Sequence, residues 1–513
     1  MTDQKSGDPF SRNRIQSSLL HFGIGKIVSG LIGLCLFIAL VRLLPATDYG
    51  TYVTFVAMME VLLIVSNLGV YPFAQRYITE ARLPAHHNYL SFVTWASVLY
   101  RAATLSVSVI LLMLGATTVL DSLGILVTFK IFALFCVAIF CEGLARYIDL
   151  LFDSLLEQAR TQICILVRNS ARLVMILGAI YFDYKIDIGF VAAVEAIAAG
   201  LGMLFSLFVL KKMLEPFGRY KRGGLKNSPF QVKRLLRFSL PYYTAQFLTQ
   251  IYSTDTVKLV ISQTLGAIDT AVFGFAHAIS FIMQRYLPAQ LLIGLLRPVL
   301  VARRAGGGSD AELLRLGNFI LKVNHFLLVP VVSFFCVAGP GFVIWLSNGK
   351  YAGASAILIL LSGLLLLQAV HAIMSAVAIA LEDRHAVLTG TIGAIPGIGV
   401  GFMLIQPLGS AGMAVGLWLS ELLWCSITWL MLRRKGFRFS IDWLAWAKLL
   451  VSGVAAGITS FLVMPSPSQG QELFLAAGIV SFTYLIICAV IKPFSQSERD
   501  ILNGMLPVPV FIF

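Results

Sequence analysis

Charged residues are scarce in this chain of 513 residues. Asp, Glu, Lys and Arg make up 12% of it and apolar residues 58%, whereas about a quarter of a soluble domain is charged. This composition excludes a soluble enzyme, a nucleic-acid-binding domain and a secreted disulfide scaffold. The seven cysteines all lie inside apolar runs without metal-ligand spacing, which is typical of small buried side chains in helices. The composition therefore predicts a polytopic membrane protein.

Sequence motifs for chemistry are absent as well. No GxxxxGK[ST] loop occurs, which excludes ATP hydrolysis by that route. No stretch between apolar segments is long enough to fold as a catalytic domain. We therefore expect no catalytic residue, no metal site and no cofactor, and the protein is predicted not to be an enzyme. Its function must sit among its helices.

Fourteen apolar segments are present instead, each long enough to cross a bilayer as a helix. At this apolarity only helices satisfy the backbone in lipid, so the predicted fold class is an all-α polytopic membrane protein with about 14 transmembrane helices. The segments are 18–44, 50–74, 90–116, 123–145, 161–182, 187–210, 237–264, 270–296, 317–347, 352–381, 385–407, 409–432, 443–464 and 472–492.

Positive charges gather on one side of these segments. With the N-terminus placed in the cytoplasm, 28 Lys and Arg residues lie in inside loops and tails and 3 lie outside. This bias predicts a multi-pass protein with both termini in the cytoplasm. The net charge of +14 is then a topology signal that faces anionic membrane lipids, and no nucleic-acid partner is expected.

The domain organisation follows from the longest basic loop and from a weak internal repeat. Nine Lys and Arg residues lie in 211–237, after the sixth segment, and the stretch 44–52 resembles 265–273. Parallel repeats are a known transporter plan, so we predict two pseudo-symmetric six-helix lobes plus two C-terminal helices. The expected parts are a cytoplasmic tail at 1–17, an N-terminal lobe at 18–210, a basic linker at 211–236, a C-terminal lobe at 237–432, helices 13 and 14 in 433–492 and a tail at 493–513.

Ionisable residues inside the apolar segments are the candidate functional residues, because each is costly in lipid and tends to face a cavity. The first half of the chain has five such cations against three anions, and this surplus predicts an anionic substrate. The predicted substrate-binding cations are Lys26, Arg101, Arg168, Arg172 and Arg285.

Two of these cations form a pair on one helix face. Arg168 and Arg172 are spaced i, i+4, and two guanidinium groups on one face suit a phosphate or diphosphate. The alternative is that they pair with Glu142 or Glu195 and hold the bundle together. Lys26 lies near the inner end of its helix, and its alternative is to snorkel to the interface.

Two acidic residues, Glu60 and Asp255, are predicted to bind a coupling proton or cation. The alternative for Asp255 is neutralisation by Lys258, three residues further on. The segment 237–264 adds aromatic and amide groups that suit sugar rings and hydroxyls, although its tyrosine pair could instead belong to an interfacial belt. These groups are Tyr242, Tyr243, Gln246, Gln250 and Tyr252.

Short motifs open each half of the chain. The first half has Gly25-Lys26-Ile-Val-Ser29, Leu43-Leu44-Pro45 and Tyr49-Gly50-Thr-Tyr52, and the second has Phe238-Ser-Leu-Pro241, Leu265-Gly266 and Phe273-Gly-Phe-Ala276. With these motifs and its 14-segment layout, the chain from about 18 to 435 resembles the polysaccharide transporter family. This family comprises the O-antigen and exopolysaccharide flippases of the multidrug/oligosaccharidyl-lipid/polysaccharide exporter superfamily.

The resemblance implies a V-shaped bundle of two lobes that works by alternating access in the bacterial inner membrane. The implied substrate is a lipid-linked oligosaccharide or polysaccharide precursor on undecaprenyl diphosphate, flipped for the biosynthesis of lipopolysaccharide or exopolysaccharide. A polysaccharide polymerase and export proteins are the implied protein partners. Two alternatives stay open: a cation-coupled multidrug antiporter, which predicts an acidic cavity, and a membrane glycan polymerase, which usually carries a large outside loop.

Overall fold

The computed structural model describes residues 12–82, 87–217, 232–289, 310–381, 384–437 and 441–505. Every regular element in these ranges is helical, which confirms the predicted all-α class. Thirteen of the described helices are long and apolar enough to cross a membrane, so the chain is a multi-pass membrane protein. It divides into two compact units: unit 1 comprises Met1–Gln250 and Ser262–Ala267, and unit 2 comprises Ile251–Ile261 and Ile268–Phe513.

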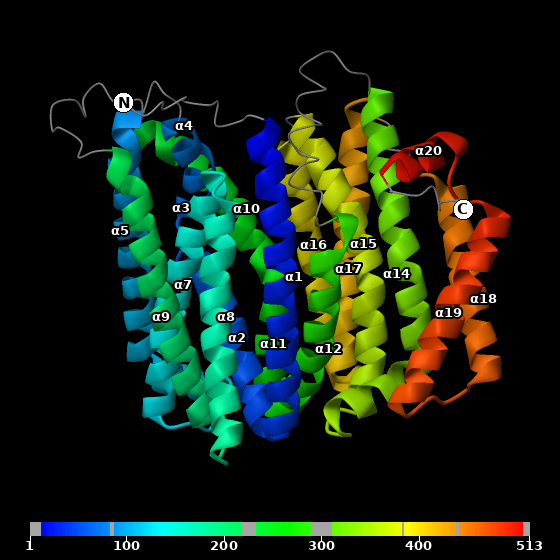
Figure 1. Cartoon of the computed structure of the whole chain (residues 1–513), viewed down its shortest axis with the longest axis horizontal. Helices are drawn as coiled ribbons and strands as arrows, with labels where there is room; N and C mark the ends of the chain where they lie inside the picture. Colours follow the sequence, from blue (N-terminus) through cyan, green and yellow to red (C-terminus); the bar gives the residue numbers. More distant parts are fainter. Residues whose placement is uncertain are drawn as a thin grey trace. The chain divides into compact units, whose positions relative to one another are not determined.

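Unit 1 is organised around the helix α7 (Phe129–Ser154), which contacts α2, α5, α8 and α9. The helices α5, α7, α8 and α9 run side by side (Figure 1). Tyr147 and Leu151 of α7 have no exposed surface and form part of the apolar core, because residues spaced four apart share one helix face. The other long helices of this unit are α1 (Arg12–Leu43), α2 (Ala46–Val65), α5 (His87–Leu114), α8 (Gln158–Tyr181), α9 (Ile188–Leu214) and α10 (Val232–Ile251).

A sharp corner interrupts the second expected segment of unit 1, at 50–74. The helix α2 ends at Val65, and the backbone turns through left-handed φ angles at Leu68 (42°) and Gly69 (85°) before α3 (Val70–Phe73) begins. The Asn67 Oδ1 accepts a hydrogen bond from the Tyr71 N–H at 2.9 Å. The turn at Gly69 needs a residue without a Cβ, and a π-helical turn, Ala74–Ile78, follows α3.

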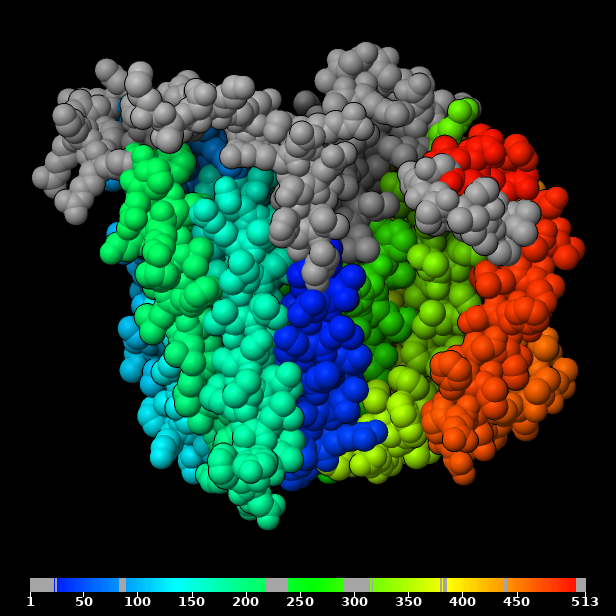
Figure 2. Space-filling view, in the orientation of Figure 1, coloured from blue at the N-terminus to red at the C-terminus, as the bar shows by residue number. Residues whose placement is uncertain are grey.

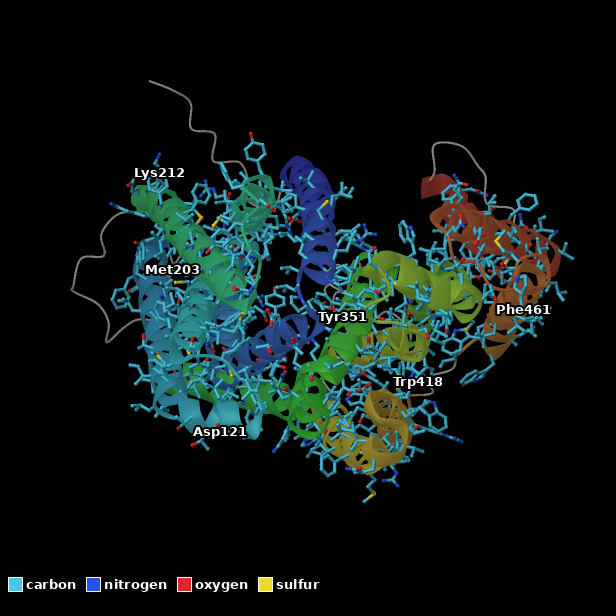
Figure 3. All side chains as sticks on the ribbon, turned by 90° about the horizontal axis from the view of Figure 1, so that it is seen from below. Asp121, Met203, Lys212, Tyr351, Trp418 and Phe461 are labelled. Carbon is cyan, nitrogen blue, oxygen red and sulfur yellow. The ribbon has the colours of Figure 1, made fainter. Side chains whose placement is uncertain are left out.

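Unit 2 holds the remaining long helices. In unit 2, α15 contacts both α14 and α17, and α18 and α19 pack against α14. Trp418 of α17, labelled in Figure 3, donates from its indole N–H to the Leu360 carbonyl of α15 at 2.8 Å. The helices are α12 (Ala267–Tyr286), α14 (Asp310–Ser347), α15 (Ala354–Ala380), α16 (Arg384–Leu408), α17 (Ser410–Arg434), α18 (Trp443–Val463), α19 (Gly470–Ile491) and α20 (Gln496–Met505).

Glycines bring α16 and α17 into backbone contact. A Cβ built on Gly397 would lie 2.4 Å from the backbone nitrogen of Ser420. A Cβ built on Gly416 would lie 2.6 Å from the Cα of Gly401. Small residues at membrane-helix interfaces permit this approach, and the stretch of glycines after Pro396 therefore packs two helices together.

One expected membrane segment, 237–264, is divided into two shorter helices. α10 ends at Ile251 and α11 spans Thr254–Leu265, and neither is among the thirteen candidate spans. Ser253 caps α11, because its Oγ accepts a hydrogen bond from the Thr256 N–H at 3.2 Å. Asp255 in the first turn of α11 further favours a helix start there.

Two other stretches contain more helix than the expected segments. α7 continues past the expected end at 145 to Ser154, and the expected tail at 493–513 contains the helix α20. Most of the tail at 1–17, most of the basic linker at 211–236 and the last residues of the chain lie outside the described residues.

Candidate functional site

A cluster of ionised side chains lies inside the membrane-spanning helices of unit 1. Its centre is Glu142 of α7, whose side chain is 6% exposed. Glu142 accepts hydrogen bonds from the Nε of Arg146 at 2.8 Å and from Arg172 at 2.9 Å, and the Nε of Arg168 lies 3.7 Å away. One buried carboxylate is thus shared by three guanidinium groups, a strong arrangement because both partners are ionised.

Each arginine of this cluster has a second carboxylate. Arg146 donates to Glu60 of α2 at 2.6 Å. Arg168 donates to Asp149 of α7 at 2.5 Å. The third arginine, Arg172, donates to Glu195 of α9 at 2.9 Å. We call these seven side chains the carboxylate–arginine network; they are Glu60, Glu142, Arg146, Asp149, Arg168, Arg172 and Glu195.

The helices position this network through their period and through one missing side chain. Glu142 and Arg146 are spaced i, i+4 on α7, as Arg168 and Arg172 are on α8, so each pair shares a face. Gly202 of α9 provides the room for Arg168, since a Cβ there would lie 2.0 Å from the Arg168 Cγ. Four helices therefore meet around charges that none of them could bury alone.

The charge balance of the network differs from the sequence expectation. Four carboxylates face three guanidinium groups, so the network carries one negative charge in excess when all its members are ionised. The expected surplus of cations omitted Arg146 and Asp149, because both lie beyond the expected segment 123–145. Both lie in the last three turns of α7, and the i, i+4 spacing of Glu142 and Arg146 was the signal that could have found Arg146.

Arg101 lies in the same unit but outside the network. Its side chain is fully buried, and it donates to the Leu63 carbonyl at 3.0 Å and to the Ser66 Oγ at 3.1 Å. Its guanidinium group also lies 5.2 Å from the centre of the Tyr71 ring. Arg101 thus caps the C-terminus of α2, where a cation is favoured by the helix dipole. A role in substrate binding stays a prediction that requires this corner to open.

The remaining predicted residues are not among the seven side chains of the network. Lys26 on α1 is half-buried. In unit 2, Arg285 is exposed near the end of α12, 5.9 Å over the Phe281 ring. Also in unit 2, Asp255 accepts a hydrogen bond from Lys258 at 2.8 Å, which is the neutralising pair that the sequence left open. The structure therefore brings together Glu60, Arg168 and Arg172 of the predicted set.

Polar groups of α10 meet the corner between α2 and α3. The Tyr243 hydroxyl donates to the Val65 carbonyl at 2.9 Å, and the Asn67 amide donates to the Gln246 Oε1 at 3.0 Å. Tyr242 and Gln246 are exposed. An interrupted helix beside amide and aromatic side chains is the kind of surface that polar ligands use in transporters.

A cavity of about 410 Å³ lies between α14, α15 and α18 in unit 2. Ser333 and Cys336 supply its only polar side chains. Val454 and Phe461 on its α18 wall are 62% and 54% exposed; Figure 3 labels Phe461, and Figure 2 shows the outer surface of α18 and α19 in orange and red. The cavity suits hydrocarbon, and its lining residues include no charged group for a phosphate.

Comparison with solved structures shows which fold this is. The chain is similar to a lipid II flippase, MurJ, in an inward closed conformation (TM-score 0.68, 13% identity, 94% of this chain and 99% of the flippase). It is also similar to an inward-facing multidrug resistance MATE transporter of the MOP superfamily (TM-score 0.61, 17% identity, 82% and 98%). A third similar structure is a MOP superfamily transporter from Pyrococcus furiosus whose binding pocket has reversed polarity (TM-score 0.59, 16% identity, 84% and 96%). At these identities the likeness shows the fold, which is that of transporters.

The sequence itself matches one family model and no curated protein. The model is described as "Polysaccharide biosynthesis protein", and it matches residues 18–290, which contain the whole carboxylate–arginine network and more than half of the chain. The chain therefore belongs to the polysaccharide biosynthesis protein family.

Proposed function

We propose that this protein is a flippase that moves a lipid-linked oligosaccharide or polysaccharide precursor across the bacterial inner membrane. Membership of the polysaccharide biosynthesis family and the transporter fold support this proposal. The protein would work by alternating access, with both termini in the cytoplasm, and would not act as an enzyme. A polysaccharide polymerase and export proteins would take the product further.

The observation that carries the proposal is the set of arginines inside the spans of unit 1. Arg146 and Arg172 keep 37% and 15% of their side-chain surface exposed. They are held by carboxylates, which a diphosphate can replace with equal hydrogen-bond geometry. The head group of an undecaprenyl diphosphate would then exchange with Glu60 or Glu195 as it enters. Within the network, Glu60 would be the acceptor of a coupling proton, since it has the most exposed carboxylate of the four.

Groups outside the network would assist. Arg285 in unit 2 is an exposed cation and Lys26 in unit 1 is a half-buried one, and each would suit a first encounter with an anionic head group. Tyr242 and Gln246 on the exposed face of α10 suit the glycan, because aromatic rings stack on sugar faces and amides bond hydroxyls. The apolar cavity beside α18 suits part of the prenyl chain.

The experiment uses the purified protein in liposomes that contain an undecaprenyl-diphosphate-linked glycan. Exposure of the glycan to an impermeant lectin measures flipping. Arg172→Ala is expected to lower the flipping rate at least tenfold, because the variant loses a guanidinium group that would bind the diphosphate through two hydrogen bonds, while Arg146 keeps its partners. Lys130→Ala is the matched control, because Lys130 is an exposed cation on α7 outside the network. Equal rates in Arg172→Ala and Lys130→Ala would refute the role of the arginines, and no flipping by the wild-type protein would refute the function.

A second function is favoured by one observation, the excess carboxylate of the network. A cation-coupled multidrug antiporter needs acidic groups to hold a cationic drug, and a net negative network supplies one. Cells that lack the protein separate the two functions. A flippase leaves the lipid-linked precursor trapped on the cytoplasmic side, whereas an antiporter leaves the glycan normal and makes the cells sensitive to cationic drugs.

A further inference from the structure

Two helices of unit 2 each carry one isolated ionisable residue deep within an apolar span. α15 has His371 as its only Asp, Glu, Lys, Arg or His, and α17 has Glu421 as its only one before the arginines at its end. The two side chains meet: the His371 Nδ1 and the Glu421 Oε2 are 2.7 Å apart. Neither residue is used by the proposed substrate site in unit 1.

The surroundings hold the imidazole in one position. The His371 ring stacks on the Trp424 indole with ring centres 3.5 Å apart and planes 5° apart. Trp424 is 1% exposed, and its indole N–H donates to the Thr391 Oγ1 of α16 at 3.3 Å. A Cβ on Gly390 would lie 3.3 Å from the indole nitrogen, so the indole is tightly enclosed. A protonated imidazole gains from the indole face as well as from the carboxylate.

The chemistry of this pair differs from that of the acidic residues predicted to couple transport. Glu60 is paired with Arg146 and Asp255 with Lys258, and arginine in particular stays charged at all physiological pH values. Histidine changes its charge between about pH 5 and 8. A proton on the pair makes its net charge zero, whereas loss of that proton leaves the carboxylate charge alone in an apolar setting, which is costly.

We propose that His371 and Glu421 form a proton-binding site of unit 2, and that uptake and release of this proton drive the transport cycle. The driving role rests on the proposed flippase function, whereas the proton site does not. The side chains are 25% and 13% exposed, so a modest opening between α15 and α17 gives them access to water. The proton moves to the imidazole, and the carboxylate balances the charge that it brings.

The helices that pack around the His371–Glu421 pair carry other titratable groups among the described residues. α17 adds Cys425, one turn from Glu421, and α16 has no ionisable residue between 386 and 408. On α14, Lys322 is bound by Asp442 and Glu498, and His325 contacts the Leu321 carbonyl at 2.7 Å and stacks on Trp446. The remaining groups with described side chains are Arg315 and Cys336 on α14, His385 at the start of α16, Arg433 and Arg434 at the end of α17, and Asp269, His277, Arg285 and Tyr286 on α12, which is joined to α15 by the Gln284–Gln368 hydrogen bond.

Solid-state NMR of the full chain in liposomes, with ¹⁵N-labelled histidine, tests the site directly. His371→Gln identifies the His371 signal by its loss. Glu421→Gln, which keeps the shape of the side chain, is expected to weaken proton binding by His371, because the variant removes the negative charge that lies 2.7 Å from the imidazole and balances its proton. His325→Gln is the control, since His325 has no carboxylate partner among the described residues, and it should leave the His371 titration unchanged.

Transport measurements then test the driving role. His371→Gln and Glu421→Gln should each abolish glycan flipping driven by a pH gradient and retain exchange of glycan at equal pH. An unchanged His371 titration in Glu421→Gln overturns the proton site, and gradient-driven flipping in both variants overturns the driving role. If the wild-type protein moves no glycan, the proposed flippase function fails, while the NMR result still decides the proton site. Elution of each variant as a monodisperse species shows that it has folded.

Discussion

The geometry of the carboxylate–arginine network predicts which substitutions within it lower the free energy of unfolding most. Asp149→Asn removes the charge closest to Arg168, whose side chain is 4% exposed and whose other carboxylate, Glu142, lies 3.7 Å away. Removal of one partner from a buried ion pair costs about 3–5 kcal/mol. The amide oxygen of asparagine still accepts one hydrogen bond, so a loss of about 3 kcal/mol is expected.

Glu60→Gln provides the matched comparison within the same network. Its partner, Arg146, is 37% exposed and keeps a hydrogen bond to Glu142 at 2.8 Å. Only the difference between a charged and a neutral hydrogen bond is lost, which is about 1 kcal/mol. Equilibrium unfolding in mixed micelles of a mild detergent and dodecyl sulfate measures both values. A loss for Asp149→Asn no greater than for Glu60→Gln would refute the idea that Arg168 depends on a buried carboxylate.

Three further substitutions probe packing and the C-terminal helix. Gly202→Ala should destabilise unit 1 by about 1–3 kcal/mol, because the new methyl group meets the Arg168 stem; thermal unfolding of the purified protein measures it, and unchanged stability would contradict the close fit. Gly416→Ala should lower the same midpoint by forcing α16 and α17 apart, whereas an equal or higher midpoint would count against backbone contact. Lys322→Met should release α20, seen as faster trypsin cleavage at its arginine, because Lys322 bonds Asp442 at 2.7 Å and Glu498 at 2.9 Å. Burial raises the pKa of Asp442, but the hydrogen bond and charge of Lys322 outweigh it and lower the pKa. The Lys322–Asp442 pair should therefore persist at neutral pH and break only below about pH 4, and its loss already at pH 6 in a ¹³C NMR titration of the labelled carboxylates would contradict this.

The fold could be predicted from hydropathy because a membrane helix needs a long apolar run, and such runs are visible in the sequence. The interruptions within these helices could not be predicted in the same way. α2 ends at Val65 within an apolar stretch, because Arg101 and Tyr243 supply hydrogen bonds to carbonyls near its end. Those hydrogen-bond donors come from other helices, so the local sequence does not predict that α2 ends there. Ser253 is the exception, since a serine followed by an aspartate two residues later is a local helix-start signal.

The candidate site could be predicted only in part, because its local spacing is visible in the sequence and its partners on other helices are not. The spacing of Arg168 and Arg172 places them on one face, and that inference needs only the helical period. Their partners lie on α7 and α9 and could be identified only as alternatives. Asp149 was missed because the helix was expected to end at 145. His371 and Glu421 are separated by 50 residues, and only tertiary structure brings a lone histidine to a lone glutamate.

A transporter of an anion must release its cargo as well as bind it, and the excess carboxylate of the network provides a means of release. Unpaired arginines would hold a diphosphate tightly, whereas carboxylates at hydrogen-bond distance compete for the same donors. If the proposed function is correct, neutralising one competitor should favour binding. The repulsion between the carboxylate and one unit charge of the diphosphate about 10 Å away is about 1.7 kcal/mol at an effective dielectric constant of about 20.

Glu60→Gln is accordingly expected to bind an undecaprenyl-diphosphate glycan about 15–20-fold more tightly than the wild-type protein and to release it more slowly. The substitution imitates a protonated Glu60, so its effect also reports what a coupling proton would do at this position. Binding measured in nanodiscs of uncharged lipid avoids competition from anionic head groups, and Lys130→Ala serves again as the control. Weaker binding by Glu60→Gln would mean that the carboxylate holds Arg146 in place for the substrate and does not compete with it.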